Sequence, residues 1–219
     1  MKQLNYKQYP ITYGVIGACV LIYIYTTINY GFQMSAYEGY LEGGFMPLAI
    51  YVDHEYLRFI TANFIHFSLG HILMNMISLH NVGPFMESVY GKGRYILLLI
   101  GSALGTTFFP YLYYLFFTNK FEGMALTVSG GASGIILGLL GGLACLAWFY
   151  KGLFQNAFKS ILPSLILITV ISLTVPTVSL SGHLGGFIGG FLMTLILIKH
   201  RPFYLWKFKN RQNPTDRPC

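Results

Sequence analysis

Three stretches of this 219-residue chain hold residue types that can carry out nucleophilic chemistry. Ser133 lies in LTVSGGASGIILGLLGG, where glycines give way to an apolar run. HFSLGHILMN begins with His66, and SGHLGGFIGG carries His183. A serine hydroxyl is a weak nucleophile until a base takes its proton, and neutral imidazole can do this around neutral pH. These residues therefore predict a serine–histidine pair, if the fold brings them together.

Each of these polar residues also has a purely structural interpretation. Ser133 stands where a helix cap would stand. Histidine and asparagine inside a membrane also join helices by hydrogen bonds. For any one residue alone we favour the structural interpretation, whereas the whole set in one chain favours chemistry.

The composition indicates a chain that crosses a membrane several times. Its mean hydropathy is +0.57, and only 10% of its residues are charged. A helix needs about 20 apolar residues to cross a bilayer. Six segments reach or approach this length: Ile11–Ile28, Phe59–Val82, Tyr95–Phe117, Gly134–Tyr150, Ile161–Val178 and His183–Ile198. We therefore predict an all-α polytopic membrane protein, with six transmembrane helices in one membrane domain, residues 11–200.

The charges indicate how these helices are oriented. With six spans both termini lie on one side, and 12 of the 14 Lys and Arg residues fall on that side. Arg58 and Lys120 fall opposite, together with five of the seven acidic residues. Because positive residues collect in cytoplasmic loops, we predict that both termini are cytoplasmic. The net charge of +7 then reflects topology and attraction to anionic lipid, and we predict no nucleic-acid partner.

Three segments lie outside the predicted spans and have distinct compositions. Residues 1–10 form a short polar arm, and residues 201–219 form a basic tail. Residues 31–58 form a long connection between the first two spans, rich in tyrosine, glycine and acids. We predict that this connection lies in the membrane interface, with its aromatic rings at the level of the lipid headgroups.

The sequence argues against two other hydrolytic chemistries. A catalytic pair of aspartates would have to be embedded in the membrane, and none of the seven acids lies deep in a predicted span. A zinc-dependent peptidase needs HExxH on a helix. His66 and His71 are five positions apart, about 140° around a regular helix, and no carboxylate accompanies them. We therefore predict no metal and no other cofactor.

Glycines recur every four residues along the two helices that carry Ser133 and His183. They are Gly134, Gly138 and Gly142 in the first helix, and Gly182, Gly186 and Gly190 in the second, with Gly185 and Gly189 beside them. Such stripes let helix backbones approach closely in membranes. Since Ser133 and His183 each lie at the leading end of a helix, packing of the two stripes would bring the hydroxyl within hydrogen-bond reach of the imidazole.

Donors for a developing oxyanion can also be found in the sequence. His71 and Asn75 are four residues apart and therefore share one helix face. The candidate donors are the backbone N–H of Ser133, the Asn75 amide and His71. Gly130 and Gly131 would let the preceding loop fold tightly above the serine. No acid is an obvious third member, so we predict a dyad.

These motifs resemble those of the rhomboid family of intramembrane serine proteases. The matching segments are GGASG at 130–134, HFSLGHILMN at 66–75 and GHLGG at 182–186. They lie on the second, fourth and sixth predicted helices, and the resemblance covers about residues 55–195. It implies a bacterial-type bundle of six helices in the plasma membrane. The fourth helix would be shorter and start within the membrane, at the floor of a cavity open to the outer side.

The resemblance also assigns roles to the residues at the site. It implies that Ser133 is the nucleophile and His183 the general base. Asn75 and His71 would support the oxyanion, beside Gly131. The implied substrates are transmembrane segments of other membrane proteins within the lipid bilayer.

Further residues would support the site rather than react. By the same resemblance His66 bonds loop backbone near the cavity, Arg58 holds the first loop, and Gly186 packs beside the catalytic helix. The fifth helix, Ile161–Val178, and the loop Pro176–Gly182 would form a side gate and a cap through which the substrate enters.

Two positions depart from the family's pattern. Many members carry Trp-Arg before the second helix, where this chain has Leu57-Arg58. Many place a tyrosine four residues after the serine, where its ring can stack near the histidine, and this chain has Leu137. Neither departure removes a catalytic atom.

Two other classes of function compete with the peptidase. A catalytically inactive rhomboid-like scaffold or chaperone is the main alternative, although such relatives typically lose the serine or the histidine, and this chain keeps both. A small transporter is the other, and it would be expected to place ionisable groups near mid-membrane. The sequence names neither the natural substrate nor the oligomeric state.

Overall fold

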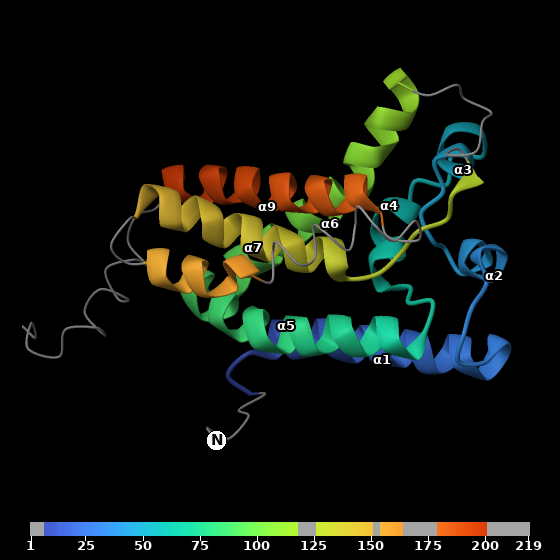
Figure 1. The fold of residues 1–219 in the computed structure, drawn as a ribbon, viewed down its shortest axis with the longest axis horizontal. Coiled ribbons are helices and arrows are strands. Elements are labelled where there is room, and N and C mark those ends of the chain that lie inside the picture. Colours follow the sequence, from blue (N-terminus) through green and yellow to red (C-terminus); the bar gives the residue numbers. More distant parts are fainter. Residues whose placement is uncertain (1–6, 118–125, 151–153, 164–178, 201–219) are drawn as a thin grey trace, which may run out of the picture.

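The computed structural model describes residues 7–117, 126–150, 154–163 and 179–200 (Figure 1). Every named element within these ranges is a helix. The long helices are α1 (Pro10–Tyr30), α5 (Leu69–Tyr90), α6 (Lys92–Phe117), α7 (Ser133–Phe149) and α9 (Leu180–His200). The short ones are α2 (Ala36–Leu41), α3 (Pro47–Val52), α4 (Arg58–Thr61) and the 3-10 helix η1 (Ala62–Phe64). Residues 155–163 are also helical.

Three of these helices are long and apolar enough to cross a membrane. They are α1, α6 and residues 180–198 of α9, while α7 is equally apolar but has 17 residues. These four helices coincide with four of the predicted spans, so the described part of the chain confirms the prediction of a helical membrane protein. The predicted fifth span, Ile161–Val178, lies outside the described residues after its first three positions, so the count of six spans stays a prediction.

The predicted second span, Phe59–Val82, is wrong as a single helix. The chain forms α4 and η1, breaks its helical path, and starts again as α5, which runs on to Tyr90. Ser68 causes the restart, because its extended backbone precedes α5 and its hydroxyl accepts the N–H of His71, as an N-cap residue does. Hydropathy averaged over a window of roughly 19 residues smooths out this break, although the polar residues His66 and His71 lie close to Ser68.

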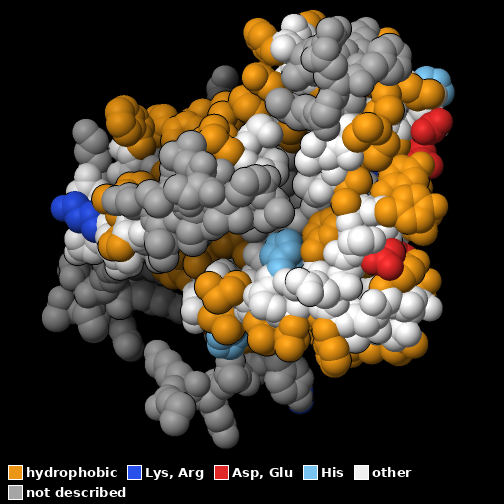
Figure 2. Space-filling view, turned by 45° about the vertical axis from the view of Figure 1, so that its right-hand side comes forward, with side chains coloured by type: hydrophobic (Ala, Val, Ile, Leu, Met, Phe, Trp, Pro, Cys, Tyr) orange, Lys and Arg blue, Asp and Glu red, His pale blue; other side chains and the backbone are white. Residues whose placement is uncertain are grey.

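The connection between α1 and α5 is folded and holds α2 and α3. Ser35 and Glu38 form a reciprocal capping box that starts α2. Tyr37, Leu41 and Leu57 are exposed on this connection. Figure 2 shows hydrophobic side chains interleaved with acidic ones on the side of the molecule that carries α2 and α3. This pattern suits an interface between lipid and water, where the sequence places the connection.

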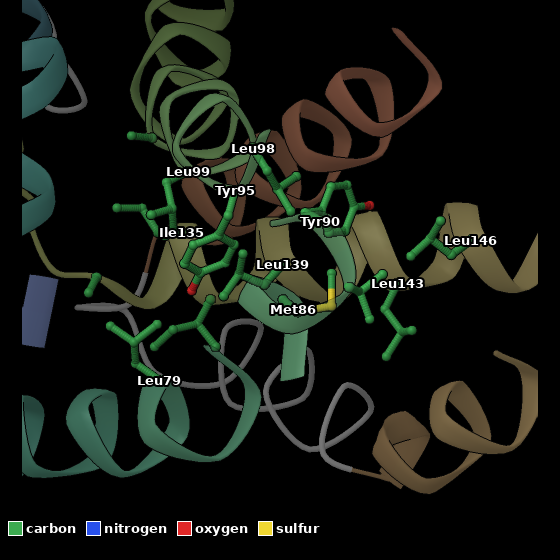
Figure 3. Close-up of a cluster of buried hydrophobic side chains, with 14 of the residues drawn as sticks. Leu79, Met86, Tyr90, Tyr95, Leu98, Leu99, Ile135, Leu139, Leu143 and Leu146 are labelled. Carbon is green, nitrogen blue, oxygen red and sulfur yellow. The ribbon is translucent and has the colours of Figure 1, made fainter. Parts of the chain in front are cut away.

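Helix α7 occupies the centre of the bundle. It lies between α9 and α5 in Figure 1, and it also contacts α6. Thirteen of its 17 residues are buried, so nearly its whole circumference is covered by protein. Figure 3 shows the core in which side chains of α5, α6 and α7 meet, including Leu79, Met86, Tyr90, Tyr95, Leu98, Leu99, Ile135, Leu139, Leu143 and Leu146.

The predicted packing of the glycine stripes of α7 and α9 is confirmed. A β-carbon on Gly186 would overlap the carbonyl oxygen of Gly134, and one on Gly190 would overlap that of Gly138. Gly185 and Gly189 face α6 instead, where Gly105 lies opposite both. Helix α9 therefore contacts both neighbours backbone to backbone, which fixes its height and rotation relative to α7.

A buried carboxylate, which the sequence analysis missed, ties α1 to the bundle. Glu87 is 3% exposed and lies near the end of α5. Its carboxylate accepts the backbone N–H groups of Ile11 and Thr12, at 3.1 Å and 2.8 Å, and the Thr12 hydroxyl at 2.8 Å. The Tyr95 hydroxyl lies 3.2 Å from Thr12 Oγ. A negative charge is favourable at the first turn of a helix, where N–H groups lack partners within the helix.

Candidate active site

Ser133 and His183 are joined by a hydrogen bond. The distance from Ser133 Oγ to His183 Nε2 is 2.8 Å, and both side chains are half-buried. Ser133 is the first residue of α7, and Ala132 occupies the N-cap position without a side-chain cap. The interpretation of Ser133 as a helix cap is therefore wrong, because its hydroxyl contacts the imidazole of α9 instead. The close contact that the glycine stripes predicted is present.

Ser179 holds the first turn of the helix that carries His183. Its hydroxyl accepts the N–H of Gly182 at 3.1 Å, and its carbonyl accepts the N–H of His183 at 3.0 Å. This is the bonding of an N-cap residue to the third residue of a helix. Ser179 was not among the predicted site residues, although a serine directly before the first apolar residue of a helix, here Leu180, is a recognised start signal.

The loop before Ser133 is fastened on two sides. Gly131 has a φ of +120°, a conformation that favours glycine, and its N–H donates to the carbonyl of Ala62 at 2.9 Å. Two residues earlier, Ser129 exchanges backbone hydrogen bonds of 2.8 Å and 2.9 Å with Phe45, in the connection between α1 and α5. The backbone that leads to Ser133 is thus hydrogen-bonded both to η1, through Ala62, and to the segment between α2 and α3, through Phe45.

His66 forms a further hydrogen bond to the loop that precedes Ser133. It is 1% exposed, and its Nε2 accepts the N–H of Ala132 at 3.4 Å. Its Nδ1 lies 3.0 Å from the carbonyl oxygen of Phe64, so Nδ1 carries the proton. The resemblance implied this kind of contact with loop backbone. His66 therefore touches the residue before Ser133 and not the serine itself.

His71 and Asn75 lie beside the tight turn at Gly131. A β-carbon on Gly131 would be 2.6 Å from His71 Nε2 and 3.5 Å from Asn75 Nδ2. Asn75 is 5% exposed, and its Nδ2 is buried without a hydrogen-bond partner among the described residues. A buried donor left unpaired is costly, which makes it a candidate to bind something absent from the free protein.

The expected separation of His66 and His71 is wrong. Their ring centroids are 5.0 Å apart in an edge-on contact, although a regular helix would separate them by about 140°. The reason is the break before α5, since His66 precedes the cap residue Ser68 and only His71 lies in the helix. The two rings therefore pack on one another under the serine loop.

The remaining predicted residues lie around the site rather than in it. Arg58 is buried, donates to the carbonyls of Tyr40 and Gly44 at 2.7 Å and 2.8 Å, and forms an ion pair with Glu55. Its guanidinium also lies 4.3 Å from the centre of the Tyr40 ring. Arg58 therefore fastens the connection that contains α2. Gly186 packs on α7, as described above, and Leu137 is buried one turn after Ser133.

The fold and the site define an integral membrane protein with a bonded serine and histidine at the leading ends of two closely packed helices. The model of the Rhomboid domain family matches residues 53–200 of the sequence. The chain therefore belongs to the rhomboid family, as its motifs indicated.

Individual relatives agree with this assignment. The chain is 31% identical to RHOMBOID-like protein 4 of Arabidopsis thaliana over 80% of its own length and 42% of that protein. It is 29% identical to rhomboid protease GluP of Bacillus subtilis (strain 168), over 80% of the chain and 32% of the relative. It is 33% identical to rhomboid protease GlpG of Salmonella choleraesuis (strain SC-B67), over 60% and 42%. The matched region thus spans less than half the length of these relatives.

Proposed function

We propose that this chain is an intramembrane serine endopeptidase that cleaves transmembrane segments of other membrane proteins. The observation that carries the proposal is the 2.8 Å hydrogen bond between Ser133 Oγ and His183 Nε2. Two relatives bear the name rhomboid protease, which supports the same reaction class. The main alternative, an inactive scaffold or chaperone, needs no bonded serine–histidine pair.

The proposed reaction uses the two residues in turn. Ser133 Oγ attacks the carbonyl carbon of the scissile peptide while His183 Nε2 takes the hydroxyl proton. The tetrahedral intermediate collapses, the C–N bond breaks, and His183 gives the proton to the leaving amine. A water molecule then attacks the resulting ester, with His183 again taking and returning a proton, and the carboxylic acid leaves. Atoms and charge balance over the cycle, and no cofactor takes part.

The proposed oxyanion site uses donors that lie at the start of α7 and on α5. The first N–H groups of a helix have no partner within the helix, so the Ser133 N–H can bind an oxyanion. Asn75 supplies a buried Nδ2 that lacks a partner among the described residues, and His71 Nε2 lies close to Gly131. The absence of a side chain at Gly131 leaves the space that both groups border.

The orientation of the protein in its membrane is also proposed. With cytoplasmic termini, the ends of α7 and α9 that carry Ser133 and His183 face the outer side of a bacterial plasma membrane. A substrate would then be cut near its outer membrane edge, after local unwinding, since a helix hides its peptide carbonyls in hydrogen bonds. The proposed gate comprises Ile161–Val178 and Pro176–Gly182, and its residues 164–178 lie outside the described residues.

The test is cleavage of a single-span protein by the purified chain in liposomes. The wild type should release two fragments, while Ser133→Ala and His183→Ala should release none above background. Ser88→Ala is the matched control, since Ser88 is exposed on α5 and bonds only its own helix. Labelling by a fluorophosphonate probe should follow the same pattern. Equal cleavage by the wild type and Ser133→Ala would overturn the proposal.

A further inference from the structure

Helix α6 places a threonine between the two helices that carry Ser133 and His183. A β-carbon on Gly134 would overlap Cγ2 and Oγ1 of Thr106 and lie 2.7 Å from its Cβ. A β-carbon on Gly186 would lie 2.8 Å from Thr106 Oγ1. Gly134 directly follows Ser133, and Gly186 is three residues after His183. One side chain thus contacts both helices in the turn that carries the reacting groups.

Thr106 contacts the two helices by van der Waals packing of its side chain, and not by a hydrogen bond to either of them. Its hydroxyl bonds the carbonyl of Ser102 in its own helix at 2.8 Å, so its single proton is already used. The methyl group and the oxygen face Gly134 with no room for another atom. Because threonine branches at its β-carbon, the side chain is stiff and holds its volume in one place.

One turn earlier in α6, a smaller residue packs against α7 in the same way. Ser102 is fully buried, faces Gly138, and bonds the carbonyl of Leu98 at 2.7 Å. At both levels α7 and α9 also approach each other backbone to backbone, Gly134 with Gly186 and Gly138 with Gly190. The larger side chain of α6 therefore lies at the level of the site, and the smaller one lies beneath it.

We infer that Thr106 is a positioning residue: its volume, packed against Gly134 and Gly186, sets the tilt of α7 relative to α9 at the level of Ser133 and His183. This inference rests on the proposed peptidase function, and it adds a residue of α6 that touches neither substrate nor the reacting atoms. A smaller side chain lets the two helices shift or tilt about their glycine contact, and a larger one pushes them out of their native alignment. Either change alters the distance from Ser133 Oγ to His183 Nε2, on which proton transfer depends.

A volume series at position 106 separates shape from hydrogen bonding. Thr106→Val keeps the shape and loses the hydroxyl, so its kcat should stay close to that of the wild type. Thr106→Ala and Thr106→Leu should lower kcat and the rate of fluorophosphonate labelling about 10- to 100-fold, with KM little changed. Leu104→Ala is the matched control on the exposed face of α6. A loss in Thr106→Val equal to that in Thr106→Ala would overturn the inference, as would full activity in Thr106→Ala.

A second test exchanges the small and the large residue between positions 134 and 106, and it applies even if the single variants fold poorly. Gly134→Ala should abolish labelling, because its methyl group would occupy the place of Thr106. Thr106→Gly removes all three of the nearest contacting atoms, so Thr106→Gly with Gly134→Ala should label faster than Gly134→Ala alone. Labelling is scored per folded molecule, from the monodisperse fraction in detergent. A double variant no better than Gly134→Ala would overturn the inference.

The activity of Ser133→Ala distinguishes a failure of the proposed peptidase function from a failure of the positioning role of Thr106. If Ser133→Ala cleaves like the wild type, the proposed function fails, and the role of Thr106 fails with it. If Ser133→Ala is inactive and the exchange at positions 106 and 134 gives no recovery, the peptidase stands and only the positioning role fails.

Discussion

Ser133 Oγ and His183 Nε2 lie 2.8 Å apart, although 50 positions of the sequence separate the two residues. The contact does not depend on the segment of chain that connects α7 to α9. It follows from two helices that touch backbone to backbone at Gly134–Gly186 and Gly138–Gly190, with both leading ends at the same level. We therefore expect the pair to respond to changes more than one turn away.

A methyl group in the helix contact should disturb the site from a distance. In Gly190→Ala the added carbon would overlap the carbonyl of Gly138, and such overpacking costs about 1–3 kcal/mol. We expect both the unfolding temperature in detergent and the cleavage rate to fall. Gly14→Ala is the control, since its added carbon meets no atom within 4 Å. Equal behaviour of the two variants would contradict this account of the packing.

Loss of the Ser179 cap should lower activity through His183. Ser179→Ala removes the bond to the Gly182 N–H, and the loss of an N-cap side chain costs about 1 kcal/mol. We expect a lower kcat with an unchanged KM. Ser179→Thr and Ser179→Asn retain a capping oxygen and should recover most of the activity. A failure of both replacements to recover activity would show that the hydroxyl acts in another way.

The Asn75 amide should matter to the reaction more than to the fold. Its Nδ2 is buried without a partner among the described residues, so its removal relieves an unpaired donor. We expect Asn75→Ala to lower kcat about 100- to 1,000-fold, as the loss of one oxyanion donor does, without a lower unfolding temperature. Asn81→Ala, at an exposed position of the same helix, is the control. An unchanged kcat in Asn75→Ala would remove Asn75 from the oxyanion site.

Glu87 should matter to the fold more than to the reaction. Glu87→Ala leaves the N–H groups of Ile11 and Thr12 without an acceptor, at a cost of about 2–4 kcal/mol in the free energy of unfolding. Glu87→Gln keeps one acceptor oxygen and should cost less. Because Glu87 lies 16 residues beyond His71 along α5, about 24 Å from it, the folded fraction should keep its kcat. Denaturant titration in mixed micelles and single-turnover cleavage would separate the two effects.

The cap of α2 should respond to acid. Hydrogen bonds from the backbone and side chain of Ser35 lower the pKa of Glu38 below its ordinary value. A carboxyl group with a depressed folded-state pKa stabilises the fold above its unfolded pKa, and this contribution is lost as the pH falls through the folded pKa. Hydrogen exchange in residues 36–41 should therefore accelerate at low pH, relative to the intrinsic rate. Glu38→Gln removes the titrating group, and its relative exchange should show no such step.

The sequence predicted most of the helices because their apolar runs are long. The span Ile11–Ile28 lies within α1, and Tyr95–Phe117 lies within α6. Hydropathy failed between η1 and α5, where the chain leaves its helical path after Phe64 and the Ser68 hydroxyl caps the new helix. It also ended the second span at Val82, eight residues early, and so left Glu87 outside the bundle.

The contact between Ser133 and His183 was predictable because glycine spacing reports which helix faces can touch. The contact between His66 and His71 was not, because it depends on the break at Ser68 rather than on helical periodicity. Thr106 could not be singled out for a similar reason. Its importance lies in what it faces, and a threonine in an apolar run is common in any membrane helix. Ser179, in contrast, carried a local start signal, because a serine directly before an apolar helix can cap it.

The backbone contacts among α6, α7 and α9 have a consequence for how this protein can change over generations. Gly105, Gly138 and Gly186 have no side chain that could adjust to a new neighbour. Almost any replacement at these positions requires a matching replacement across the contact, so single neutral steps are scarce there. We expect inherited variation to collect instead in residues 31–58 and on the lipid-facing sides of the helices, where the surface could change without altering the contact between Ser133 and His183.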